Sequence, residues 1–159
     1  MKISILFLFG FIIIAPVVIS QNGINQLDSQ GNRHGIWKKN FNNSEQIRYK
    51  GTFDHGKEIG VFMFYCEDCG VTPIMTKSFN ENDATSEVKY FSKKGILISV
   101  GSMKDKLRIG PWIYYHTGTN NIMTKENYKN GLLDGKKLTY YKTNVLAEEI
   151  NYQKGIKEG

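Results

Sequence analysis

The sequence predicts an all-β fold in which tandem antiparallel β-hairpins form an elongated, single-layer, twisted meander sheet. A motif of about 25 residues recurs six times, and a short fixed period is typical of arrays in which each unit shares its core with its neighbours. After the first 20 residues, no window of 11 or more residues shows helical periodicity, whereas short aromatic and β-branched runs recur.

The first 20 residues have the pattern of a secretory signal peptide. Lys2 provides a positive charge, residues 3–19 form an apolar run, and Ser20 is a small residue before an expected cleavage site. An uncleaved membrane anchor is the alternative, because the apolar run approaches the length of a membrane span. The cleavage pattern favours an exported protein, located in the periplasm, the cell envelope or outside the cell, with a mature chain of residues 21–159.

Residues 21–159 form a single repeat domain with three marked positions in each copy. These are an aromatic residue or its replacement, a glycine three residues later, and a glycine four residues after that. The copies begin at Asp28, Phe53, Phe79, Met103, Tyr128 and Tyr152, and the last copy is incomplete. The glycines at the two positions are Gly31, Gly35, Gly56, Gly60, Gly110, Gly131, Gly135, Gly155 and Gly159. We expect them to form the turns of the hairpins.

Two copies depart from this glycine pattern. The third copy has Asn82 and Ser86, and the fourth has Lys106 at the first position. We expect Asn82 to adopt a left-handed conformation, which asparagine tolerates better than most residues. Lys106 would be strained if its φ were positive.

Short runs of strand-forming residues lie between the glycines. The outgoing runs are 37–41, 62–65, 88–91, 112–115 and 138–141, and the returning runs are 47–53, 97–103, 122–128 and 146–152. Each returning run has an aliphatic residue six positions before its repeat marker, so both side chains share a face and specify the register. The fifth outgoing run starts one residue late, which predicts a β-bulge. The aromatic residues expected to hold the repeats together are Trp37, Phe53, Phe62, Trp112, Tyr114, Tyr128 and Tyr140.

Three segments of the array carry a recognisable signature: 90–97, 110–115 and, most closely, 127–135. These segments resemble the MORN repeat and its bacterial variant, the YwqK-type antitoxin repeat. The resemblance covers roughly residues 28–159. It implies tandem β-hairpins in a single-layer sheet, used for protein association or, in some members, for attachment to membrane lipids.

Cys66 and Cys69 are the only cysteines and follow the second outgoing run. In an exported chain a disulfide is the first expectation. Free thiols remain open as an alternative, as does half of a zinc site completed by two histidines drawn from His34, His55 and His116. A redox-active pair would need a βαβ unit and a helix N-terminus, which the sequence does not indicate.

The sequence shows no catalytic constellation. His34 and His55 belong to glycine-flanked turns, no nucleophile motif accompanies them, and we expect them on a polar surface. Asp54 and His55 are adjacent, and adjacent residues of a strand face opposite ways, so we do not expect them to act together. The prediction is a protein that is not an enzyme and has no bound metal or cofactor.

The formal net charge is +6, and loss of Lys2 lowers it to +5. Basic residues recur at 38–39, 93–94 and 136–137, and around Arg108. Gathered at one rim of the sheet, they would suit anionic lipid headgroups or glycans. The plainer interpretation is a solvated edge that discourages strand addition. The regular structural places of the aromatic residues disfavour nucleic acid as a partner.

The expected function is therefore an exported, non-enzymatic scaffold that presents an interaction surface to an unidentified protein partner. The second hypothesis is a peripheral module that binds anionic membranes or glycans. The third is an antitoxin-like protein that neutralises a toxin, and it rests on the family resemblance alone.

Overall fold

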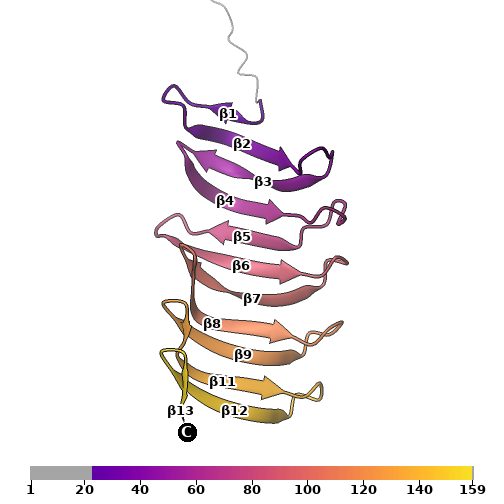
Figure 1. Ribbon diagram of the computed structural model, residues 1–159, viewed down its shortest axis with the longest axis vertical. Helices are drawn as coiled ribbons and strands as arrows, with labels where there is room; N and C mark the ends of the chain where they lie inside the picture. Colours follow the sequence, from indigo (N-terminus) through magenta and orange to yellow (C-terminus); the bar gives the residue numbers. More distant parts are fainter. Residues whose placement is uncertain (1–22, 159) are drawn as a thin grey trace, which may run out of the picture.

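The computed structural model describes residues 23–158, which form strands, turns and loops (Figure 1). Thirteen strands make one open antiparallel sheet, and this confirms the predicted all-β, single-layer architecture. The expected signal peptide at 1–20 and the glycine expected at position 159 lie outside the described residues. Among residues 23–158, no helix is long and apolar enough to cross a membrane.

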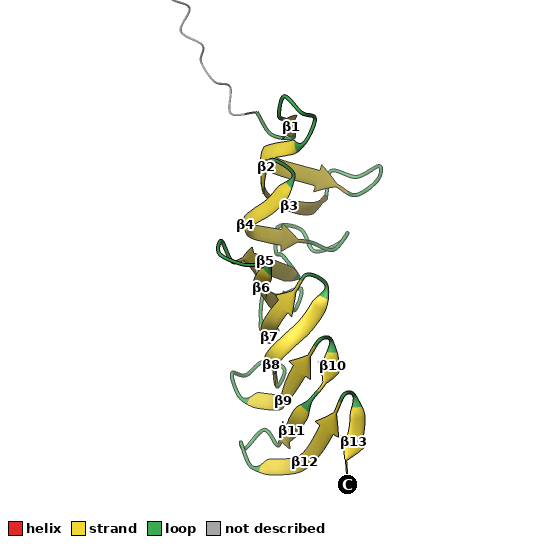
Figure 2. Ribbon diagram, turned by 90° about the vertical axis from the view of Figure 1, so that its left-hand side faces the viewer, coloured by secondary structure: helices red, strands yellow, loops and turns green. Residues whose placement is uncertain are grey.

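The strands follow one another in space in nearly the order of the sequence. Their bounds are β1 Gln26–Leu27, β2 Arg33–Asn40, β3 Ile47–Asp54, β4 Lys57–Phe64, β5 Met75–Phe79, β6 Thr85–Phe91, β7 Leu97–Lys104, β8 Leu107–Tyr115, β9 Ile122–Lys129, β10 Leu132–Leu133, β11 Gly135–Tyr140, β12 Leu146–Gln153 and β13 Ile156–Glu158. The short β10 pairs with β9 beside β11. Figure 2 shows the strands stacked along the long axis, with no second layer over either face.

The predicted returning runs agree closely with the structure. Strands β3, β7, β9 and β12 begin at the predicted residues and end one residue beyond the predicted ends. The prediction missed β5, because Met75–Phe79 contains three polar residues among its five and follows the irregular cysteine loop. The outgoing strands begin three to five residues earlier than predicted, since they include the second glycine position.

Most of the core lies on one side of the sheet, which we call the aromatic face, whereas Tyr65, which is 6% exposed, is buried on the other side beside Met63. The members of the aromatic face are Trp37, Phe53, Phe62, Phe64, Phe79, Val88, Tyr90, Trp112, Tyr114 and Tyr128. Trp112 is 0% exposed and Phe62 is 1% exposed. Phe62 packs edge-on against Phe53 at 5.1 Å and Phe79 at 5.6 Å between ring centroids. Such pairs contribute about 0.5–1.5 kcal/mol each beyond the burial of their area, so they join successive hairpins.

Tight turns lie along one rim of the sheet, which we call the tight-turn rim. The turn between β9 and β10 is typical: Asn130 and Gly131 have φ values of 52° and 83°, as a type I′ hairpin turn requires. The Gly131 N–H donates to the Arg108 carbonyl of the previous copy at 2.9 Å, and Gly56 donates to Arg33 at 2.8 Å in the same way. The first glycine position therefore links one repeat to the next.

The third and fourth copies, which lack a glycine at the first position, form their turns in different ways. Asn82 does not have a positive φ, so the expectation for that residue was wrong. The loop between β5 and β6 is instead longer, and its amides bond to side chains: Asn82 N–H to Asn80 Oδ1 at 3.1 Å and Thr85 N–H to Asp83 Oδ1 at 2.7 Å. In the fourth copy Asp105 has the positive φ, of 54°, and Lys106 avoids the strained region.

The second glycine position forms a bulge in the outgoing strand. Thr52 pairs with Ile59 and Lys50 pairs with Met63, so two extra residues of β4 lie between these pairs. Gly60 adopts a φ of 63° there. The same two-residue shift occurs in β8, where Gly110 has a φ of 60°. An insertion of two residues preserves the alternation of faces, so the aromatic side chains stay on one side.

Candidate interaction surface

The side of the sheet opposite the aromatic face carries aliphatic side chains that are exposed or half-buried. We call this side the aliphatic face, and its apolar members include Ile36, Ile59, Val61, Met63, Ile98, Val100, Ile109 and Ile113. Ile36 is 57% exposed and Val61 is 48% exposed. Among residues 23–158 no second layer covers them. Exposed apolar surface of this kind is typical of contact sites for other molecules.

Lysines are interleaved with these aliphatic residues. Five lysines lie on the aliphatic face, because each is next to a strand residue that points to the aromatic face. They are Lys38, Lys50, Lys89, Lys125 and Lys136, next to Trp37, Gly51, Val88, Glu126 and Lys137 respectively. Two acidic residues of this face are already paired, Glu87 with Lys89 and Glu149 with Lys136, each at 2.6 Å. A partner with apolar side chains and carboxylates would therefore complement this surface.

A shallow depression marks one end of the aliphatic face. It has a volume of about 190 Å³ and is lined by Ile36, Lys50, Thr52, Val61 and Met63. The depression offers a place for one apolar side chain beside a positive charge.

Side chains of the aromatic face pack against one another, and an open hollow of about 680 Å³ remains beside Tyr90, Ser99, Arg108 and Tyr114. The Arg108 guanidinium lies 4.3 Å from the centroid of the Trp112 ring system and 5.3 Å from that of Tyr128. Arg33 occupies the same repeat position three copies earlier, 5.0 Å from Trp37 and 5.1 Å from Phe53. Cation–π contacts of this kind stabilise the folded chain. Sequence reasoning placed Arg108 in a basic cluster and missed this role, although its spacing to Trp112 repeats that of Arg33 to Trp37.

A polar network continues from Arg108 across three strands of the aromatic face. Arg108 Nη1 donates to the hydroxyl oxygens of Tyr114 at 2.8 Å and Tyr128 at 3.1 Å. The Tyr128 hydroxyl donates to Glu126 at 2.8 Å, and Lys137 Nζ lies 3.2 Å from the other oxygen of that carboxylate. Each charge in the network has a partner, so the arrangement favours a structural role over acid–base chemistry.

Burial and hydrogen bonding shift the pKa values of this network in different directions. Burial, followed by the nearby Glu126 charge, raises the pKa of Tyr114 well above its ordinary value. Burial also acts to raise the pKa of Glu126, but hydrogen bonds from Tyr128, Lys137 and Tyr114 outweigh it and lower that pKa. Glu126 therefore stays ionised and Tyr114 stays protonated at neutral pH.

The fifth copy replaces an apolar pair by a charged one. Gly51 faces Phe62 and Gly101 faces Trp112 across neighbouring strands. The register of β9 with β11 puts Glu126 and Lys137 at the corresponding positions. Lys137 therefore occupies the position that Phe62 and Trp112 occupy in their copies. The fifth outgoing run begins one residue late in the sequence, which had suggested Leu138 for this position. The expected bulge exists between Thr139 and Tyr140, but similar bulges recur in other copies.

Tyr140 differs from the other aromatic residues expected to join the repeats. Leu138 pairs with Lys125, and the Lys125 ammonium lies 5.9 Å from the centroid of the Tyr140 ring. Tyr140 therefore belongs to the aliphatic face, whereas Trp37, Phe53, Phe62, Trp112, Tyr114 and Tyr128 lie on the aromatic face.

The structure has Cys66 and Cys69 bonded to each other, with 5.1 Å between their Cα atoms. Their loop lies on the rim opposite the β3–β4 turn, which holds His55 (Figure 1). His34 lies in β2 beside that turn and not in a turn as expected, so the cysteines and these histidines cannot share a zinc ion. Asp68 within the loop bonds to Lys93, which lowers the pKa of the Asp68 carboxyl. His116 Nε2 lies 2.9 Å from the Tyr140 carbonyl oxygen.

The recurring basic pairs do not gather at one rim. Lys38 and Lys39 alternate between the two faces, as do Lys136 and Lys137, while residues 93–94 lie in the loop after β6. Comparison with protein-family models, with curated proteins and with solved structures finds no match to this sequence.

Proposed function

We propose that this chain is an exported, non-enzymatic scaffold of the MORN-repeat type whose aliphatic face binds a protein partner. The observation that carries the proposal is the unequal burial of the two faces of the sheet. The aromatic face buries its rings against one another, while Ile36, Val61 and Ile98 on the other side remain exposed. A sheet that leaves aliphatic side chains in water gains free energy when a partner covers them.

The charges on the aliphatic face indicate the chemistry of that partner. Among residues 23–158, Lys50 and Lys125 have no acidic partner; their ammonium groups lie 6.0 and 5.9 Å from the ring centroids of Tyr65 and Tyr140. The acidic residues Glu87 and Glu149 each form an ion pair with a lysine. A partner with an apolar strip and unpaired carboxylates fits this pattern. Charge complementarity would speed association and fix its orientation, and it would make binding sensitive to salt.

Site-specific photocrosslinking in the native host tests which face binds. A photoreactive residue replaces Ile36 or Val61 on the aliphatic face, and Lys39 or Glu148, both exposed on the aromatic side, as matched controls. We expect a protein adduct of one defined mass from the aliphatic positions alone. Equal adducts from both faces, or none from Ile36 and Val61, would contradict the proposal.

Charge reversal then separates a protein partner from a membrane. The double substitution Lys50→Glu and Lys125→Glu should weaken binding of the crosslinked protein, whereas Lys39→Glu should leave it unchanged. Sedimentation with anionic vesicles at low salt is the companion measurement. Vesicle binding that the double substitution abolishes, without any protein adduct, would assign the face to a lipid surface and overturn the proposed protein partner.

A further inference from the structure

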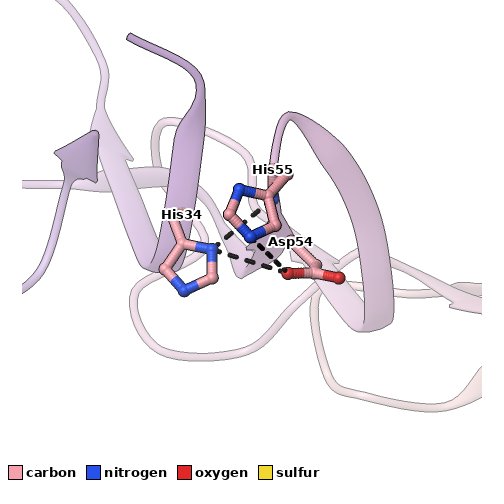
Figure 3. Close-up of side chains that lie close together, drawn as sticks. All are labelled: His34, Asp54 and His55. Atoms are coloured by element: carbon pink, nitrogen blue, oxygen red, sulfur yellow. Dashed lines mark hydrogen bonds and ion pairs between the residues drawn. The ribbon is translucent and has the colours of Figure 1, made fainter. Parts of the chain in front are cut away.

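Three side chains with metal-ligating atoms meet on the tight-turn rim: His34, Asp54 and His55 (Figure 3). His34 Nδ1 lies 3.5 Å from Asp54 Oδ1, and His55 Nε2 lies 3.8 Å from the same oxygen. One ligand atom from each residue falls within 4.8 Å of the others. All three residues are exposed, so an ion in solution can reach them.

The register and the turn bring these residues together. Gly35 pairs with Phe53, which places His34 of β2 beside Asp54 at the end of β3. His55 has a φ of 44°, so the chain leaves the strand path and its ring turns back toward Asp54. The His55 N–H also donates to His34 Nδ1 at 3.5 Å, a long hydrogen bond that a metal ion at this nitrogen would replace. The expectation that Asp54 and His55 face opposite ways was wrong, because it treated the turn as a continuing strand.

The separations suit a tetrahedral metal ion. Zinc binds histidine nitrogen and carboxylate oxygen at about 2.0–2.2 Å, so two such ligands at tetrahedral angles lie about 3.3–3.6 Å apart. The distances of 3.5 and 3.8 Å to Asp54 Oδ1 therefore need only small adjustments, and the ligand nitrogens of the two histidines, which lie within 4.8 Å of each other, would move closer on binding. Two imidazoles and one carboxylate also suit zinc better than calcium or magnesium, which prefer oxygen ligands.

Asp28 provides an independent indication. Its Oδ2 lies 2.6 Å from His55 Nδ1, and its side chain is only 8% exposed. Backbone N–H groups of Gln30 and Asn32 hold its other oxygen at 2.9 and 2.8 Å. A metal-binding histidine commonly donates its second ring N–H to a carboxylate, which fixes the ring and directs the other nitrogen to the ion. Asp28 gives His55 this arrangement and leaves Nε2 facing Asp54.

The geometry points to a site for a divalent transition metal of the Zn²⁺ class, with His34 Nδ1, Asp54 Oδ1 and His55 Nε2 as ligands. Asp28 is the positioning residue, and the fourth coordination position is open to water. The site lies on the tight-turn rim and is separate from the aliphatic face, so it goes beyond the proposed partner binding.

Calorimetric titration of the purified, untagged protein with ZnCl₂ tests the site, with the Cys66–Cys69 disulfide kept oxidised so that thiols do not bind the ion. We expect one saturable site. His55→Asn is the central variant, because Asn130 has a left-handed conformation at the corresponding turn position. It and Asp54→Asn should lower the affinity at least 100-fold, and Asp28→Asn about 10- to 100-fold. His116→Asn is the matched control and should bind normally.

Circular dichroism and thermal unfolding of each variant, without metal, show whether it has folded. Titration of the wild-type protein with Co²⁺ gives a second readout that needs no variant, since tetrahedral coordination produces a visible absorption band that a chelator removes. The proposal is overturned if the wild type shows no saturable zinc site, or if His55→Asn binds as the wild type does. Either result would leave the crosslinking test of the aliphatic face unaffected.

Discussion

The Trp112 indole lies directly against Gly101 on the neighbouring strand. A Cβ atom added to Gly101 would fall well under 3.0 Å from the ring, and Gly51 and Phe62 have the same relationship two copies earlier. Both rings are fully buried. The two glycines therefore provide the space in which the most buried aromatic side chains pack.

Gly101→Ala should destabilise the protein by about 1–3 kcal/mol, because the methyl group forces a buried indole from its position. Urea unfolding followed by tryptophan fluorescence measures the change. Ser102→Ala, on the next residue and the opposite face, is the control and should change stability much less. An unchanged unfolding midpoint for Gly101→Ala would show that Trp112 relaxes without cost.

Arg108→Lys should destabilise the protein by about 1–2 kcal/mol, although the charge is kept. Lysine lacks the planar guanidinium that stacks on Trp112 and donates to both Tyr114 and Tyr128. Arg33→Lys should cost less, because Arg33 contacts two rings without those hydroxyl bonds. Thermal unfolding of the two variants side by side tests this order, and a larger loss at Arg33 would contradict it.

Lys154→Asn should stabilise the protein by a few tenths to about 1 kcal/mol. Lys154 has a φ of 50° in the turn before Gly155, and asparagine tolerates this left-handed conformation better than lysine. The resulting Asn-Gly sequence is the preferred one for a type I′ turn. Thermal unfolding should show a higher midpoint, while Gln153→Asn in the adjoining strand should give no such increase.

Stability should fall below about pH 4.5 partly because of Glu126. Its folded-state pKa is lowered from 4.5, so the unfolded chain binds this proton first as the pH falls. The stabilisation is complete above the unfolded-state pKa and is lost as the pH falls through the folded-state pKa. Urea midpoints measured across the acid range should decline less steeply for Glu126→Gln than for the wild type. Parallel curves would exclude this contribution.

Strand positions were predictable because strand-forming runs and turn glycines act locally, and the starts at Ile47, Leu97, Ile122 and Leu146 agree with them. The expectation that these residues share a face with their repeat markers was wrong, because a bulge at each site pairs them with residues of the opposite face. The Arg108–Trp112 stacking and the Gly101 contact depend on which side chains meet across strands, and this requires the register of each bulge. The unequal burial of the two faces also emerged only from the structure, since both faces of each strand contain apolar residues.

The metal-ligating cluster was missed for a related reason. The alternation rule applies to extended backbone, and His55 is the residue at which the chain stops being extended. His34 and His55 belong to different copies of the repeat, so their proximity follows from the pairing of β2 with β3. The sequence did contain one indication of this proximity: His34 lies near the start of one predicted strand and His55 follows the end of the next, and these two ends meet in an antiparallel pair.

The sequential strand order also determines how the molecule responds to mechanical load. Each interior strand is held mainly by the strands before and after it. Tension applied along the stack would open the backbone ladders one hairpin at a time, beginning at an end. A pull along the strands would instead shear a whole ladder at once and meet greater resistance. The protein should therefore be compliant in one direction and stiff in the other.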